Sequence, residues 1–402
     1  MDLEEALASL KAQLVPISEV EHCALQHSRG RVLAKPVTAQ LSLPPFRASA
    51  MDGYAIQAGK HDQILNVIGE SLAGHPFQGD IGPGECVRIF TGALVPANAD
   101  QIILQEEVSA REGRQVRFNV HSPSESYIRP IGNDLKVGSQ IAAQGDVLNP
   151  FLMGSLASAG VSVVEVFRKP VIGVFSSGDE LRDPGVAVED LLAGQIYDSN
   201  RLTVMQLLAT LPVEVRDLGR LADDAGAVSE ALANGALDCD AMITSGGVSV
   251  GDADYISETI EKLGTLAFWR LNLKPGKPMA FGKIGNCWIF GLPGNPVSTI
   301  VTALLLVRPA LATLAGTVAD APLRIKAKLT TPLQHQPGRR EYQRGTFTQH
   351  AGEFAVSHTG DQGSNRLSTF HAANCLIEVD KETGDLNSGH WVNILPLTYL
   401  IN

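Results

Sequence analysis

The chain has 402 residues, which at roughly 100–200 residues per domain predicts two to four domains. Its 44% hydrophobic and 19% charged residues are typical of a soluble globular protein. The net charge of −11 argues against a general nucleic-acid binder, which needs a basic face, but it allows a local positive pocket for an anionic ligand.

The cysteines, the N-terminus and the apolar runs indicate the cellular location of the protein. The five cysteines are far apart and form no Cys-x-x-Cys pair, which argues against a disulfide framework and a zinc ribbon. Reduced thiols, together with an acidic N-terminus unlike that of a signal peptide, favour a cytoplasmic location. The longest apolar stretch, Val297 to Val307, is too short for a membrane span and predicts a buried helix. We expect neither membrane nor nucleic acid among the partners.

The N-terminal half predicts a discontinuous domain with a β-rich insertion. Residues 2–14 carry apolar side chains on one helical face. Short strands with frequent glycine and proline follow as far as about Arg129, and residues 150–168 return to helix and strand character. We therefore expect residues 1–48 and 130–168 to form an N-terminal linker and dimerisation domain, and residues 49–129 to form an inserted β-rich domain.

The C-terminal half predicts two further domains. Residues 169–318 alternate strand and helix, which predicts a doubly wound α/β domain with a parallel sheet. Residues 319–402 predict a small β-barrel or sandwich. The candidate strands of the α/β domain are Val171–Phe175, Val213–Leu218, Ala241–Thr244 and Trp288–Phe290, and its candidate helices are 199–211, 223–234, 252–263 and 296–314.

Three glycine-rich turns follow apolar runs of this α/β region, and each opens an expected helix. They comprise residues 176–180, 245–254 and 291–296. In an open parallel sheet such turns lie beyond the carboxyl ends of the strands, where ligands bind. Gly246 and Gly247 let the backbone approach a ligand because they carry no Cβ.

Acidic residues gather at the same expected strand ends. Asp179-Glu180, Asp223-Asp224 and Asp254 would repel one another unless a cation or a proton is shared. Mg²⁺, which proteins hold with a few carboxylates and the phosphates of a ligand, is the natural cation. Capping of a helix N-terminus is the alternative explanation, and for Asp252 it is the favoured one.

A lysine loop lies between the second and third turns. The prolines and the glycine of Lys274–Pro278 fix its course, so that the ammonium groups of Lys274 and Lys277 are aimed at one target. The helix expected at Pro296 offers free N–H groups and the Ser298 hydroxyl to an anion, although a helix start that binds nothing explains this turn equally well when it is taken alone. Together these features predict a site for an anionic, phosphorylated ligand. The histidines are scattered, so we do not expect histidine catalysis.

These segments together resemble the molybdopterin molybdenumtransferase family, the bacterial MoeA proteins and the related gephyrin E domain. The resemblance implies an elongated four-domain subunit and a homodimer in which the α/β domain of one subunit faces the N-terminal half of its partner. It also implies Mg²⁺-dependent cleavage of adenylylated molybdopterin, with insertion of molybdate into its dithiolene and release of AMP. The matching elements, in the family's order, are Ser49–Ala55, Thr91–Ala93, Phe175–Leu181, Tyr197–Asn200, Ser245–Tyr255, Lys274–Pro278 and Gly291–Ser298.

The resemblance carries site residues with it. By motif, the residues that the family uses for activity fall on Asp52, Thr91, Arg129, Asp134, Glu180, Asp223, Asp254, Lys274, Pro293 and Pro296. We assign catalysis to Asp52, Thr91, Glu180, Asp223, Asp254, Lys274 and Lys277, and Mg²⁺ binding to Glu180, Asp223 and Asp254. We assign substrate binding to Arg129, Asp134, Gly246, Gly247, Ser249, Arg270, Pro293, Gly294, Pro296, Ser298, Arg344 and Ser364.

Molybdate is a tetrahedral dianion, so its seat needs cations and fixed N–H or O–H donors. We expect Lys274, Lys277 and Ser298 to form that seat, with Arg344 and Ser364 from the last domain. Two positions depart from the pattern. Position 270, where related chains can carry lysine, is arginine, and the segment around Arg129 is less basic than in some relatives.

Two other functions stay open. One is the preceding enzyme of the pathway, which adenylylates molybdopterin, although its glycine loop is expected to continue Gly-Gly-Thr-Gly where this chain has 246–249 as Gly-Gly-Val-Ser. The other is a non-catalytic molybdopterin-binding scaffold. The implied partners are the pterin substrate, a second copy of the chain, the upstream adenylyltransferase and downstream molybdoenzyme chaperones.

Overall fold

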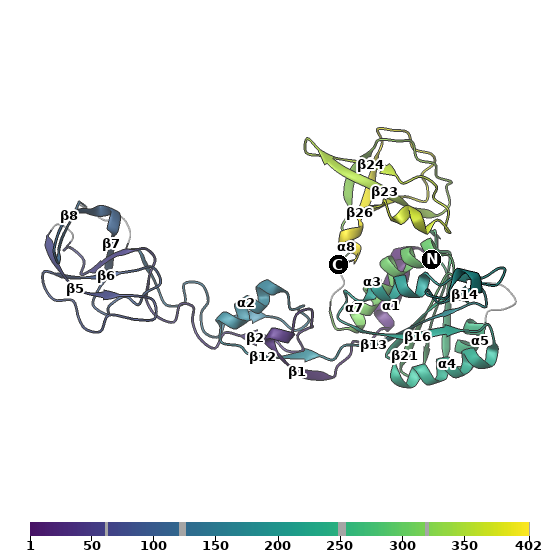
Figure 1. The fold of residues 1–402 in the computed structure, drawn as a ribbon, viewed down its shortest axis with the longest axis horizontal. Helices are drawn as coiled ribbons and strands as arrows, with labels where there is room; N and C mark the ends of the chain where they lie inside the picture. The colour runs from purple at the N-terminus through teal and green to yellow at the C-terminus, as the bar shows by residue number, and fades with distance from the viewer. Residues whose placement is uncertain (61–62, 120–125, 248–254, 318–320, 402) are drawn as a thin grey trace. The chain divides into compact units, whose positions relative to one another are not determined.

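The computed structural model describes residues 1–60, 63–119, 126–247, 255–317 and 321–401 (Figure 1). The chain divides into two compact units. The first comprises Met1–Glu21, Gly30–Ala34 and Glu165–Asn402, and the second comprises His22–Arg29 and Lys35–Val164. The chain passes from one unit to the other at four points, of which the first falls within strand β1 (Val20–Ala24) and the last within strand β12 (Val163–Phe167).

The first unit contains a six-stranded sheet with the order β16-β13-β17-β21-β20-β18. The three inner parallel strands are buried on both faces, which explains why they read as nearly continuous apolar runs, whereas the parallel strand at the edge is partly exposed. The parallel strands are β13 (Val171–Ser177), β16 (Glu214–Leu221), β17 (Ala241–Ser245) and β21 (Cys287–Leu292); the antiparallel strands are β18 (Thr265–Arg270) and β20 (Pro278–Ile284).

Helices cover both faces of this sheet (Figure 1). On one face, α1, α3 and the helix that runs through α6, η4 and α7 share a core with Ile172 and Ile243, while α4 and α5 pack on the other face around Phe175 and Met242. The predicted doubly wound α/β fold is therefore confirmed. The helices are α1 (Leu3–Gln13), α3 (Asn200–Leu208), α4 (Ala225–Asp238), α5 (Tyr255–Leu263), α6 (Pro296–Thr302), the π-helical η4 (Ala303–Val307) and α7 (Arg308–Leu314).

The stretch Pro296–Leu314 is the predicted buried helix. It has 19 residues, which by length and composition would suffice to cross a membrane, but 89% of its apolar window is buried inside the structure. Its leucines and valines form the centre of the core on the α1 and α3 face. A core helix of a globular domain passes the same length and composition test.

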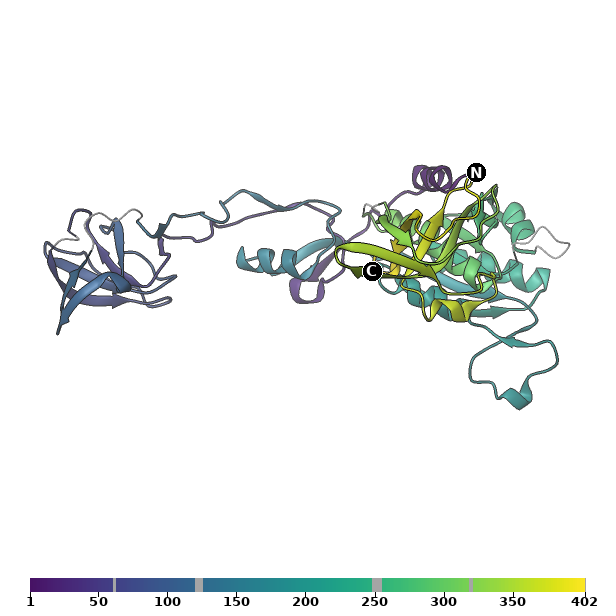
Figure 2. The same cartoon turned by 90° about the horizontal axis from the view of Figure 1, so that it is seen from above.

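The C-terminal part of the first unit is a closed β-barrel, as predicted. Strand β23 pairs with both β24 and β25, which closes the order β23-β24-β22-β26-β25 on itself, and β19 extends it by pairing with β23. Figures 1 and 2 show the barrel, in green and yellow, beside the α/β domain. The elements are β19 (Leu273–Lys274), β22 (Ile325–Leu329), β23 (Arg340–His350), β24 (Glu353–His358), η5 (Leu367–Phe370), β25 (Cys375–Val379), β26 (Trp391–Pro396) and α8 (Leu397–Ile401).

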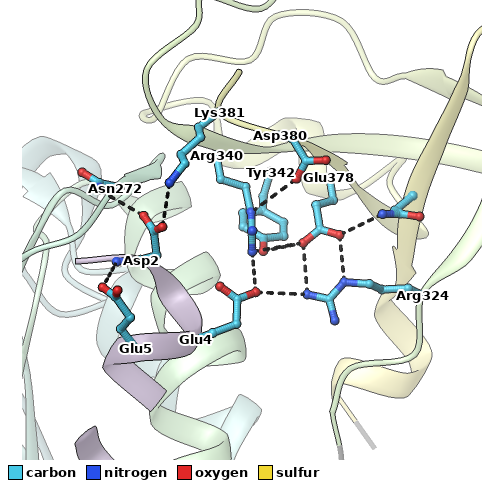
Figure 3. A network of polar contacts seen from close by, with 11 residues as sticks. Asp2, Glu4, Glu5, Asn272, Arg324, Arg340, Tyr342, Glu378, Asp380 and Lys381 are labelled. Atoms are coloured by element: carbon cyan, nitrogen blue, oxygen red, sulfur yellow. Dashed lines mark hydrogen bonds and ion pairs between the residues drawn. The ribbon is translucent and has the colours of Figure 1, made fainter. Parts of the chain in front are cut away.

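Helix α1 belongs to the first unit because its apolar face is buried there. Leu3, Ala6 and Leu10 lie in the same core as η4 and α7. Charged residues next to this face contact the barrel (Figure 3): Glu4 lies 2.5 Å from Arg340 Nη1, and Asp2 lies 2.8 Å from Lys381 Nζ. The compact units thus divide residues 1–48, which we assigned to one domain. Met1–Glu21 and Gly30–Ala34 belong to the first unit, and the other residues of this range belong to the second. The four proposed domain boundaries stay a prediction.

The second unit is rich in β-structure. Its six-stranded sheet has the order β7-β4-β6-β5-β9-β8. Neighbouring residues such as Cys86 and Val87 point to opposite faces, and each face has its own apolar cluster. The elements are η1 (Leu25–His27), β2 (Val37–Thr38), β3 (Ala48–Ser49), β4 (Gly53–Ile56), β5 (Ile64–Ser71), β6 (Glu85–Ile89), β7 (Gln101–Leu104), η2 (Gln105–Glu107), β8 (Val108–Glu112), β9 (Gln115–Phe118), β10 (Ile128–Arg129), β11 (Gln140–Ala142) and α2 (Pro150–Ser158).

Candidate active site

A cleft of about 1520 Å³ lies in the first unit, at the carboxyl ends of the parallel strands. Its walls come from the glycine turns, from the lysine loop and from the barrel loop 360–365. The predicted site residues that line it are Glu180, Asp223, Gly246, Gly247, Lys274, Lys277, Pro293, Gly294, Pro296, Ser298 and Ser364. Residues 248–254, with the predicted Ser249 and Asp254, lie outside the described residues.

The second and third glycine turns are in direct contact. The N–H of Gly246 donates to the carbonyl of Leu292 at 3.1 Å, which joins the end of β17 to the end of β21. Gly246 has a φ of +93°, and a Cβ there would lie 2.7 Å from the carbonyl oxygen of Ser177. Only glycine therefore fits where these strand ends meet.

Asn200 holds the same two turns from the start of helix α3. Its Nδ2 donates to Ser245 Oγ at 2.8 Å and to the carbonyl of Gly294 at 2.7 Å. The preceding Asp198 is buried and accepts a hydrogen bond from Ser176 Oγ at 2.6 Å. The segment Tyr197–Asn200 belonged to the predicted motif, but the sequence assigned no role to Asn200. Its position at the start of a helix after a strand end was the available signal.

Two of the three predicted metal ligands lie at neighbouring strand ends. Asp223 Oδ1 accepts a hydrogen bond from Ser177 Oγ at 2.6 Å. Glu180 folds back over Gly178, where a Cβ would come within 2.6 Å of its Oε2. Within the part of the chain that the structure describes, no group of three or more His, Cys, Asp or Glu side chains could hold a metal ion.

The lysine loop presents its two ammonium groups differently. Lys274 Nζ lies 3.0 Å from Oε1 and 3.1 Å from Oε2 of Glu341 on β23, and the backbones of β19 and β23 pair at these residues. Lys277 is exposed, and no hydrogen bond or ion pair of its side chain is found with any residue in the described ranges. Lys277 is therefore a cation available to an anionic ligand in the cleft.

Arg344 lies beneath the barrel loop rather than among the described residues that line the cleft. Its fully buried guanidinium donates to the carbonyls of Asp361, Gln362 and Gly363 at 3.1–3.2 Å, and burial lowers its pKa to about 10. This bonding braces the loop that carries Ser364, whose carbonyl accepts from the N–H of Val297 at 3.0 Å. A role of Arg344 in direct substrate contact stays a prediction.

Arg270 also lies outside the described lining of the cleft. It is exposed at the end of β18, where it pairs with Pro278 of the strand that follows the lysine loop. Its carbonyl accepts a hydrogen bond from the N-terminal ammonium of Met1 at 3.2 Å. Its predicted role in substrate binding stays a prediction.

The remaining predicted residues lie in the second unit. Asp52 Oδ1 accepts two hydrogen bonds from Thr91, one from the backbone N–H and one from Oγ1, both at 2.7 Å. The backbone N–H of Thr91, followed by its hydroxyl, holds the pKa of Asp52 below its usual value. Arg129 is exposed on β10 opposite Ala48, and the N–H of Asp134 donates to the carbonyl of Leu43 at 2.9 Å.

The sequence did not identify two polar residues of β23 that line the cleft. Glu341 and Gln343 are almost fully buried, and both border it. They are two residues apart, so a strand places them on one face. That spacing was the available signal, since the contact of Glu341 with Lys274 depends on the pairing of strands distant in sequence.

Three family models match the chain. Residues 1–160 match the MoeA N-terminal region (domain I and II), residues 173–313 a probable molybdopterin binding domain, and residues 326–397 the MoeA C-terminal region (domain IV). Together they cover both units and include most of the residues that line the cleft.

Curated and solved relatives cover the whole chain. A molybdopterin molybdenumtransferase of Haemophilus influenzae is 39% identical over 100% of both chains. Gephyrin of Dictyostelium discoideum is 32% identical over 98% of this chain and 62% of its own length. The crystal structure of a molybdopterin biosynthesis moeA protein from Pyrococcus horikoshii has a TM-score of 0.82 at 28% identity and covers 98% of this chain and 99% of that one.

Proposed function

Because this chain belongs to the molybdopterin molybdenumtransferase family, with a role in molybdenum cofactor biosynthesis, we propose that it inserts molybdate into adenylylated molybdopterin and releases AMP. The observation that carries the proposal is the cleft in which glycine turns, strand-end acids and two lysines meet. Each group supports one part of this reaction.

The glycine turns and the neighbouring polar groups would bind the phosphorylated pterin. Asn200 fixes the turns at Ser245 and Gly294, so their backbone is held before a ligand arrives. Backbone that is held close to the cleft without Cβ atoms can approach a phosphate. Preorganised contacts of this kind align the substrate for reaction without ordering costs at the moment of binding.

The oxyanion seat would combine an exposed cation and a cation that is paired with a carboxylate. Lys277 supplies an exposed ammonium, and Lys274 supplies one held by Glu341. Ser298 and Ser364 border the same cleft and provide hydroxyl donors, while Arg344 braces the loop of Ser364. Cations with fixed donors bind a tetrahedral dianion through charge-assisted hydrogen bonds.

Glu180 and Asp223 fit the requirements of a Mg²⁺ ion. Both border the cleft, and Mg²⁺ in phosphate sites is usually held by one or two carboxylates together with substrate phosphates. Asp254, outside the described residues, is the proposed third ligand. A bound Mg²⁺ would supply charge neutralisation at the phosphate. The hydrogen bond from Ser177 orients the Asp223 carboxylate toward this task.

The second unit and the assembly complete the proposal. Asp52 and Thr91 would act with Arg129 and Asp134 in a site shared between two subunits, in which the N-terminal half of one copy serves the α/β domain of the other. We also propose a cytoplasmic location. The upstream adenylyltransferase and downstream molybdoenzyme chaperones are proposed as partners that deliver the substrate and accept the product.

Substitution of the lysines tests the oxyanion seat. We expect Lys277→Ala and Lys274→Ala each to raise the molybdate concentration needed for half-maximal turnover by roughly 10- to 100-fold, the value of one charge-assisted hydrogen bond. Lys326→Ala is the matched control, because Lys326 is an exposed lysine of β22 that does not border the cleft. Unchanged molybdate dependence in both cleft variants would place the seat elsewhere.

A further inference from the structure

A buried carboxylate forms an ion pair with Lys274. Glu341 is 2% exposed, and its two oxygens lie 3.0 and 3.1 Å from Lys274 Nζ. Its Oε2 also lies 2.8 Å from Nδ1 of His335, whose side chain is fully buried. The three side chains therefore form a chain of contacts that runs from the buried His335 through Glu341 to Lys274 in the wall of the cleft.

We propose that Glu341 is a positioning residue that fixes the Lys274 ammonium for the oxyanion, and that His335 in turn holds Glu341. This inference rests on the proposed function, because it concerns the molybdate seat of that same cleft. Lys274 has a flexible four-carbon stem and three N–H donors. Glu341 occupies donors on the barrel side, which leaves the remainder for a ligand in the cleft.

His335 gives the carboxylate a second anchor. Its backbone N–H donates to Asp385 Oδ1 at 2.8 Å, which fixes the residue, and its Nε2 has no partner among the described residues. An unpaired buried nitrogen is tolerated best as an acceptor without a proton. The geometry thus places the proton on Nδ1, where it is donated to Glu341.

Glu341 has two opposing effects on a dianion. Its negative charge repels the dianion, whereas its hold on Lys274 keeps a cation in place. Both carboxylate oxygens already have partners in Lys274 and His335, so little of the negative charge faces the cleft uncompensated. The Lys274 side chain is 41% exposed and would lose its position without this acceptor. We therefore infer that the positioning effect is the larger one.

Equilibrium dialysis of the full-length protein with molybdate alone tests the inference. We expect Glu341→Gln to bind molybdate roughly tenfold more weakly than the unsubstituted protein, since one charge-assisted restraint is lost. Glu378→Gln is the matched control, because Glu378 is an equally buried carboxylate of the same barrel that pairs with Arg324 and does not border the cleft. We expect its molybdate affinity to stay unchanged.

A double-substitution cycle separates positioning from structural damage. If Glu341 acts through Lys274, then Glu341→Gln adds no further loss to a Lys274→Met variant, because interacting residues are not additive. A structural defect would instead weaken binding in both backgrounds by the same factor. Equal or tighter binding by Glu341→Gln alone, or an additive cycle, would overturn the inference.

Failure of the seat itself is a distinct result. If the unsubstituted protein does not bind molybdate in dialysis, the proposed seat is wrong, whatever the variants do. If the unsubstituted protein binds molybdate and Glu341→Gln binds it equally well, the positioning role is wrong. Should Glu341→Gln fail to fold by circular dichroism, Glu341→Asp replaces it in the cycle: it keeps the charge, shortens the reach to Lys274, and is expected to weaken binding in the same direction.

Discussion

At the scale of single residues, the hydrogen bonds from Thr91 to Asp52 predict how turnover depends on pH. The backbone N–H and the hydroxyl of Thr91 hold the pKa of Asp52 below its usual value, so its carboxylate stays ionised to lower pH. Thr91→Val removes only the hydroxyl bond, and we expect the pKa of Asp52 to rise and the acid limb of the turnover profile to move to higher pH. The measurement is the pH–rate profile.

The control for this substitution is Thr348→Val, because Thr348 is an exposed threonine in strand β23 of the first unit. We expect its profile to match that of the unsubstituted protein. An acid limb that stays in place in Thr91→Val would mean that ionisation of Asp52 does not limit turnover.

The sequence predicted the place of several cleft residues, while their roles stay a prediction. Glu180 and Asp223 border the cleft because turns after neighbouring parallel strands meet at one edge of a sheet. Lys274 and Lys277 border it from the lysine loop that precedes β20. Glu341 did not follow from the sequence, because its place depends on the pairing of β19 with β23, which are far apart in the chain. Local patterns carry no information about such pairings.

At the scale of elements, a polar cluster between α1 and the barrel predicts acid sensitivity (Figure 3). Burial by itself raises the pKa of Glu378, but hydrogen bonds from Arg324 and Tyr342, both at 2.8 Å, outweigh it and lower the pKa. A carboxylate with a lowered folded-state pKa stabilises the fold above its unfolded value of 4.5 and loses this contribution as the pH falls through the folded value.

We therefore expect Glu378→Gln to lower the free energy of unfolding at neutral pH by roughly 1–3 kcal/mol, the cost of a lost bond to a charged partner. The loss should shrink as the pH falls from 4.5 through the lower folded-state pKa, because the carboxyl of the unsubstituted protein is first protonated in the unfolded state and then in the folded state. Urea unfolding at several pH values measures this. Glu353→Gln, at an exposed position of β24, is the control, and an equal loss at all pH values would contradict the assignment.

Helices and strands were predicted correctly where an apolar run of the right length is bounded by a glycine-rich turn. The strand expected at Ala241–Thr244 and the helix expected at 296–314 match the structure, and the apolar run before each glycine turn is a parallel strand. The antiparallel strands β18 and β20 were not predicted. These two strands flank the lysine loop, whose prolines and glycine suggested only a loop. Their strand conformation depends on tertiary pairing, because β20 pairs with β21 and β18 pairs with β20.

At the scale of the whole molecule, a site shared between subunits predicts complementation. Asp52 lies in the second unit and Lys277 in the first. If each site takes one residue from each copy, mixed dimers of Asp52→Ala and Lys277→Ala chains contain one intact site and one doubly substituted site. Random pairing should then restore about a quarter of the full activity, since half of the dimers carry one intact site of two.

Co-expression of the two variants with different tags, followed by activity assay of the mixed preparation, measures this recovery. Each variant purified alone provides the baseline. Recovery that is absent although mixed dimers form would show that each subunit completes its own site, and a monomer in sedimentation would exclude the shared site altogether.

The most direct test of the account is incubation of the protein with adenylylated molybdopterin, Mg²⁺ and molybdate, with AMP release and molybdenum content of the pterin measured together. The account predicts AMP release that requires Mg²⁺, with molybdenum appearing in the pterin, and a weakened response to molybdate in Lys277→Ala. A folded protein that binds the pterin but releases no AMP would contradict the account and favour a scaffold, and formation of adenylylated molybdopterin from ATP would favour the adenylyltransferase.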